Sequence, residues 1–122
     1  METFTYKNYQ NCYFTVGSYV ADTTAMAISI VNDEDGLIST CTIYDEFGFY
    51  ASNSITVKNY SENSHMTDFL KSLGVVIDTI DRRPCNRKVG HTLYSENPQT
   101  IDTCIINKDI LKRYCKEWNY NV

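Results

Sequence analysis

The chain has 122 residues, of which 43% are hydrophobic and 21% charged, and its formal net charge is -4. This length predicts a single domain, residues 1–122, with a substantial core, and the composition excludes a disordered chain. No apolar run approaches the roughly 20 residues that a membrane helix needs. No basic-then-apolar leader follows Met1, so we expect a cytoplasmic protein without membrane contact.

The first half of the chain predicts β-strands. Apolar and polar side chains alternate there, as in half-buried strands, and the predicted strands cover residues 3–6, 12–16, 26–31, 37–44 and the region of Ile55 and Val57. The turn Asp33-Glu34-Asp35-Gly36 joins two of these strands, and its Asp-Gly pair is typical of a β-hairpin. Further short strands are expected over residues 75–80, 91–94 and 101–106.

Two helices complete the predicted fold. Met66, Phe69, Leu70 and Leu73 have helical spacing, with Asn63 or Ser64 as the expected N-cap and Gly74 as the terminator. A last helix, capped by Asn107, would present one apolar face made of Ile110, Leu111, Tyr114, Cys115 and Trp118. The fold class is therefore α+β: a mostly antiparallel sheet with two helices, one after the segment Lys-Asn-Tyr-Ser-Glu-Asn and one at the C-terminus.

Charge is divided unevenly along the chain. Residues 1–81 carry 3 basic and 11 acidic side chains, whereas residues 82–122 carry 8 basic and 4 acidic ones. Such asymmetry indicates either a charged interaction face or two halves that pair with each other in the fold.

An enzyme is not expected. The five cysteines form no Cys-x-x-Cys pair, which excludes the common zinc and thioredoxin signatures. Cys12, Cys41, Cys104 and Cys115 are predicted to be core residues. Cys85 and His91 could form a nucleophile and base, but no orienting group accompanies them.

The remaining catalytic and metal signals are weak too. His65 is expected to face solvent in the first turn of its helix. The three carboxylates of residues 33–35 could hold a hard cation, but the spacing of a calcium loop is missing. We therefore expect neither a metal nor a cofactor.

Two candidate binding surfaces remain. Carboxylates can imitate nucleic-acid phosphates and occupy a basic channel; the acidic and aromatic loops that would do so contain Asp33, Glu34, Asp35, Asp45, Glu46, Phe47 and Tyr50. The alternative is a basic surface that contacts nucleic acid itself, made of Arg82, Arg83, Arg87, Lys88, Lys108, Lys112 and Lys116. The last three lysines, spaced four residues apart, would share one helix face.

A family resemblance adds a genomic context. Asn32-Asp33-Glu34-Asp35-Gly36, then Val57-Lys58-Asn59-Tyr60-Ser61-Glu62-Asn63, and finally Met66-x-x-Phe69-Leu70 with Gly74 are the residues that carry it. Over roughly residues 1–81 the chain resembles a family of small uncharacterised proteins, a domain of unknown function carried by conjugative elements and prophages of Gram-positive bacteria. The resemblance implies no catalytic residues, and it implies the cytoplasm of a bacterial host.

Accessory genes of mobile elements often encode inhibitors of host immunity. The resemblance therefore implies a non-enzymatic protein that binds a host protein, such as a CRISPR nuclease or restriction complex, and acts as an anti-CRISPR or antirestriction inhibitor. The acidic and aromatic loops would occlude the nucleic-acid or effector surface of that target. The alternative is a small nucleic-acid-binding accessory protein that uses the basic second half.

Overall fold

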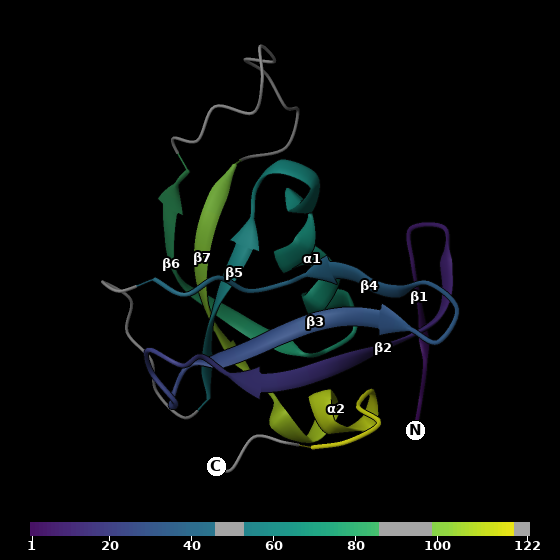
Figure 1. The fold of residues 1–122 in the computed structure, drawn as a ribbon. Helices are drawn as coiled ribbons and strands as arrows, with labels where there is room; N and C mark the ends of the chain where they lie inside the picture. Colours follow the sequence, from purple (N-terminus) through teal and green to yellow (C-terminus); the bar gives the residue numbers. More distant parts are fainter. Residues whose placement is uncertain (46–52, 86–98, 119–122) are drawn as a thin grey trace.

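The strands form two antiparallel sheets rather than one. The computed structural model describes residues 1–45, 53–85 and 99–118. The first sheet has the order β1-β2-β3-β4 and contains β1 (Phe4–Tyr6), β2 (Tyr9–Ser18), β3 (Met26–Asn32) and β4 (Gly36–Thr40). The second has the order β5-β7-β6 and contains β5 (Ser54–Asn59), β6 (Val76–Pro84) and β7 (Thr100–Ile106). Every strand pair within them is antiparallel, and Figure 1 shows the second sheet crossing steeply behind the first.

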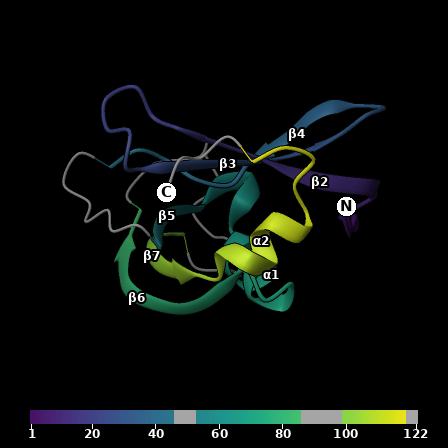
Figure 2. The same ribbon diagram turned by 90° about the horizontal axis from the view of Figure 1, so that it is seen from below.

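Two short helices lie on the same side of the first sheet (Figure 2). These are α1 (Met66–Ser72), which packs against β5 and β6, and α2 (Lys108–Arg113). A 3₁₀ turn, Ser61–Asn63, precedes α1. The α+β class and the antiparallel pairing agree with the sequence, whereas the division into two sheets does not follow from it.

The predicted strand 37–44 is divided between the two sheets, and Thr42 explains why. Its hydroxyl accepts a hydrogen bond from the backbone N–H of Ile28 at 3.0 Å. At the end of β4, this side-chain oxygen therefore accepts the hydrogen bond that a backbone carbonyl would accept in a regular strand pair. The backbone then turns to β5: the N–H of Lys58 donates to the carbonyl of Cys41 at 2.8 Å, and Thr42 bridges Val57. Residues 41–43 therefore connect the two sheets.

The core is one cluster of buried side chains from both sheets and both helices. The alternation of β3 places Met26, Ile28 and Ile30 inside, each at most 1% exposed. From the helices, Met66 and Leu70 of α1 and Leu111 of α2 are fully buried in the same cluster. Burial of these apolar side chains is the main stabilising contribution of the fold.

The two helix N-termini are capped differently. Asn107 caps α2 as expected, because its side-chain oxygen accepts from the N–H groups of Asp109 and Ile110. The expected α1 cap, Asn63 or Ser64, is wrong. The cap comes from β5 instead, where Asn59 Oδ1 accepts the N–H of Thr67 at 3.0 Å.

The last helix is shorter than its apolar periodicity predicts. It ends at Arg113, because the carbonyl of Tyr114 accepts the backbone N–H of Phe14 at 2.7 Å and Cys115 bridges Phe14 of β2. Tyr114 and Trp118 still pack against the core, but as parts of the segment that follows the helix. Between α1 and β6, Gly74 has φ +81, as predicted for a helix terminator.

Candidate interaction surfaces

The acidic turn forms the tip of the β3–β4 hairpin and is held in place by hydrogen bonds. Asn32 accepts the backbone N–H of Asp35 at 2.6 Å and donates to the carboxylate of Asp35 at 3.1 Å. The Tyr13 hydroxyl donates to Asp33 at 2.7 Å, and Lys116 lies 3.2 Å from the same oxygen. These contacts lower the pKa of Asp33, with the Tyr13 hydrogen bond as the larger cause.

The other part of the predicted acidic surface lies elsewhere. Asp45 follows the connection between the sheets, and its carboxylate pairs with Arg83 of β6. In Figure 1 the hairpin tip and the chain leading to Asp45 lie at opposite ends of the first sheet. Glu46, Phe47 and Tyr50 lie outside the described residues. The described acidic residues therefore form two separate regions.

Much of the predicted basic surface is engaged in ion pairs. Arg82 donates to Asp102 through Nε at 3.0 Å and Nη2 at 2.8 Å. Arg83 pairs with Asp45 and also lies 3.5 Å from Asp81. Arg87 and Lys88 lie outside the described residues. Within the described chain, these pairs reduce the positive charge left for a polyanion.

The three lysines of the last helix do not share one helix face as predicted. Lys108 and Lys112 belong to α2, but the helix ends before Lys116, which pairs with Asp33 instead. Partial burial is the larger cause of a lowered pKa at Lys108. The Lys112 ammonium lies 4.9 Å from the centre of the Trp118 ring. The Asp33–Lys116 and Asp45–Arg83 pairs show that the acidic and basic halves of the chain partly neutralise each other.

The thiols divide as the sequence predicts. Cys12, Cys41, Cys104 and Cys115 are buried, and burial raises the pKa of Cys104 and of Cys115 to about 11, so both stay protonated. Cys85 is half-buried, and its suggested base His91 lies outside the described residues. Residues 1–45, 53–85 and 99–118 contain no group of His, Cys, Asp and Glu side chains that could hold a metal.

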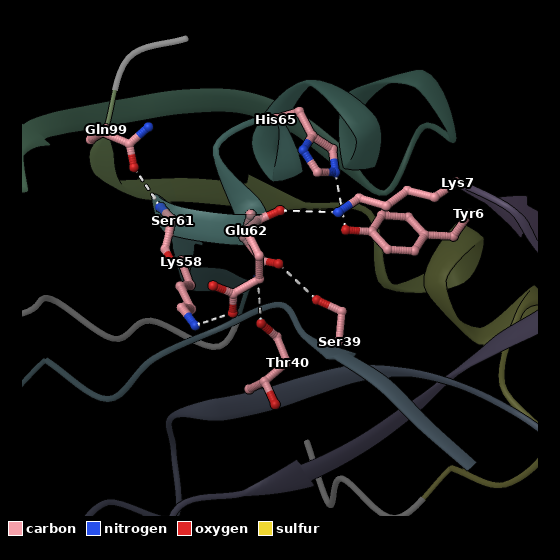
Figure 3. A network of polar contacts seen from close by, with 10 residues as sticks. Tyr6, Lys7, Ser39, Thr40, Lys58, Ser61, Glu62, His65 and Gln99 are labelled. Atoms are coloured by element: carbon pink, nitrogen blue, oxygen red, sulfur yellow. Dashed lines mark hydrogen bonds and ion pairs between the residues drawn. The ribbon is translucent and has the colours of Figure 1, made fainter. Parts of the chain in front are cut away.

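His65 is not the solvent-facing residue that the sequence suggests. Its ring stacks on Tyr6 with centroids 5.7 Å apart, and its Nε2 lies 3.0 Å from the Tyr6 hydroxyl (Figure 3). Burial is the main cause of a lowered pKa at His65, and the Lys7 ammonium adds to it. This environment stabilises a neutral imidazole that holds β1 against α1.

The segment Lys58–Asn63 is the centre of a polar network (Figure 3). Lys58 and Glu62 form an ion pair at 2.6 Å. Asn63 is fully buried: it accepts from the Ser39 hydroxyl at 2.8 Å and donates to the carbonyl of Thr40 at 2.6 Å. With the Asn59 cap, these contacts join β4, β5 and α1, so the segment has a structural role.

The environment of His65 predicts a pH effect on stability. The folded state holds the His65 pKa below its ordinary value of 6.5, so the unfolded chain binds a proton more readily. Stability from this group is present above pH 6.5 and is lost as the pH falls toward the folded pKa. The free energy of unfolding, measured by urea titration at about pH 7.5 and about pH 5, is expected to fall.

The variant His65→Gln isolates this effect. It keeps a polar side chain near Tyr6 and cannot titrate, so its loss of stability between the same two pH values is expected to be smaller. Glu62, whose pKa is held at about 2 chiefly by Lys58, does not titrate in this range. An equal pH dependence in both proteins would contradict a neutral, half-buried His65.

Comparison of the chain with protein-family models, with curated proteins and with solved structures gave no match. The resemblance to a family of mobile-element proteins therefore stays a prediction. In the described part of the chain, no helix is long and apolar enough to cross a membrane.

Proposed function

We propose that the protein is a non-enzymatic, protein-binding inhibitor that a phage or other mobile element directs against a host nucleic-acid-handling or defence complex. The observation that carries this proposal is the tip of the β3–β4 hairpin. There, Asp33, Glu34 and Asp35 are exposed next to Leu37, which is 66% exposed. An apolar side chain among carboxylates suits a target surface that is basic and contains an apolar pocket.

Two physical properties of the tip support binding. Its backbone and two of its carboxylates are already fixed by Asn32, Tyr13 and Lys116, so little conformational freedom is lost when a partner docks. Surfaces that grip nucleic acid are rich in Lys and Arg, and carboxylates pair with these side chains as phosphates do. Leu37 would supply the apolar anchor and Glu34 a charge-specific contact, and the tip would thereby block nucleic acid.

Leu37→Asp tests this proposal. The tagged protein is first used to capture its target from nuclease-treated host lysate, and the captured protein is then purified for affinity measurements. We expect Leu37→Asp to weaken that binding by a factor of about 10 to 100, because the apolar anchor is lost while the carboxylates remain. The affinity of the wild type should also fall as salt is added.

A matched control is Val20→Asp. Val20 is fully exposed in the loop between β2 and β3, so this change adds the same charge away from the hairpin tip and should leave the affinity unchanged. Equal weakening by both substitutions would contradict docking through the tip. Capture that disappears on nuclease treatment, with direct binding of DNA or RNA that falls steeply with salt, would favour the nucleic-acid-binding alternative.

A further inference from the structure

The outer edge of β6 has no strand beside it within the described chain. The second sheet has the order β5-β7-β6, so β7 covers one side of β6 only. β6 has nine residues, which is long for an edge strand. Unpaired backbone groups on such an edge are a template for another strand.

Two irregularities in β6 coincide with its exposed apolar residues. The register with β7 shifts between Val76 and Asp78 and again between Thr79 and Asp81. The residues left without a partner at these shifts are Ile77 and Ile80, which are 61% and 51% exposed. A bulge directs the extra residue out of the regular pleat.

This arrangement differs from the usual protection of a sheet edge. Edge bulges and charges normally prevent pairing with other chains, but here the bulged positions carry β-branched apolar side chains that favour strands. Pro84, which lacks an N–H donor, limits the edge at its C-terminal end. The isoleucines therefore indicate an edge that is covered in solution.

The charges of β6 identify the covering strand. The N-terminal half of β6 carries the exposed Asp78. The C-terminal half carries Asp81, which pairs with Arg83 of the same strand, and the two arginines Arg82 and Arg83, whose side chains are 45% and 43% exposed, so its net charge is positive. A second β6 running antiparallel sets the acidic half of each strand against the basic half of the other. When the two-fold axis passes through Ile80, Asp78 of one copy lies opposite Arg82 of the other. Ile80 of one copy then lies opposite Ile80 of the other.

We propose that β6 is a self-association edge through which two copies of this chain form an antiparallel dimer. The two three-stranded sheets then form one sheet of six strands, with the order β5-β7-β6 continued by β6-β7-β5 of the second copy. The Arg82–Asp102 pair stays intact in this arrangement, because the exposed part of the guanidinium receives the incoming carboxylate. This inference does not depend on the proposed inhibitor function.

The test is sedimentation equilibrium of the full chain up to about 1 mM, because an interface of one strand pair is small and expected to be weak. A reversible dimer is expected. Ile80→Arg places two guanidinium groups together on the two-fold axis and is expected to raise the dissociation constant at least about tenfold. Val20→Arg, an equally drastic change in the loop between β2 and β3, should leave it unchanged.

The register is tested by cross-linking. In Ile80→Cys the two new thiols face each other, so mild oxidation should join two copies rapidly. In Ile77→Cys the thiol lies opposite the second copy's Arg83, and cross-linking should be at least about tenfold slower. The protein with its five native cysteines gives the background rate.

Three results would overturn the proposal. The first is a monomer at every concentration. The second is a dimer whose dissociation constant is unchanged in Ile80→Arg, which would place the interface elsewhere. The third is a monomeric protein whose free energy of unfolding in urea falls in Ile80→Arg. That result would mean that another part of the same chain covers the edge.

Discussion

Replacing Asp102 with alanine is expected to lower the free energy of unfolding by about 3–5 kcal/mol. The Asp102 side chain is fully buried and accepts hydrogen bonds from Thr67 of α1 at 2.6 Å and from two nitrogens of Arg82. Burial alone would raise the pKa of this carboxyl, but the hydrogen bonds from Arg82 and Thr67 outweigh it and leave the pKa lowered. Urea unfolding followed by circular dichroism measures the loss.

The size of this effect follows from what the substitution leaves behind. In Asp102→Ala, the Thr67 hydroxyl loses its acceptor inside the fold, and Arg82 is left without its counter-charge. Because the Arg82 side chain is 45% exposed, water partly compensates it, and the expected loss lies near the lower end of the range.

Two further variants make the prediction specific. Asp68→Ala removes an exposed carboxylate next to Thr67 and should cost less than about 1 kcal/mol. Thr67→Val replaces the hydroxyl with a methyl group of similar size. Its cost should not add to that of Asp102→Ala, because both substitutions break one shared hydrogen bond. Fully additive losses, or a loss in Asp102→Ala no greater than in Asp68→Ala, would contradict the role assigned to this carboxylate.

Phe14→Ala is expected to be similarly damaging, with a loss of about 3–5 kcal/mol. The Phe14 ring is 1% exposed and lies 4.7 Å from the ring of Phe4 and 6.2 Å from that of Tyr114, between centroids. The substitution therefore opens a cavity where β1, β2 and the chain after α2 meet. Since a typical domain is stable by only about 5–15 kcal/mol, we expect a large unfolded fraction of this variant at elevated temperature.

The neighbour Thr15 supplies the control for Phe14. Its side chain is exposed on the same strand, so Thr15→Ala should change the free energy of unfolding by less than about 0.5 kcal/mol. Phe14→Leu, which keeps much of the volume, should fall between the two. A loss in Phe14→Ala below about 1 kcal/mol would argue against this packing.

Local rules predicted the parts of the fold that depend on neighbouring residues. The Asp35-Gly36 turn forms a hairpin, Asn107 caps α2, and Gly74 takes a left-handed conformation. The division into two sheets could not be predicted this way. It depends on the Thr42 hydroxyl accepting the N–H of Ile28, and a pattern of alternating side chains does not contain that contact.

The candidate surfaces show the same limit. In the sequence, Asp33 and Lys116 each belong to a surface predicted to bind a partner. In the fold they pair with each other, although 83 positions separate them in the chain. No sequence motif identifies Asp102, because it is a single Asp in an apolar strand. The only signal was its position among Ile101, Cys104 and Ile105, where a charge needs a partner.

The contact between Phe14 and the segment after α2 bears on the order of folding during synthesis. The backbone of Phe14 bonds Tyr114, and that of Glu2 bonds Arg113, so the first strands are completed by residues that are translated a hundred positions later. Until those residues emerge from the ribosome, the part of β2 around Phe14 lacks this contact and remains open to chaperones and to aggregation. Folding of this chain should therefore wait for residues 113 and 114, and a ribosome-stalled chain that ends before residue 108 should remain sensitive to protease.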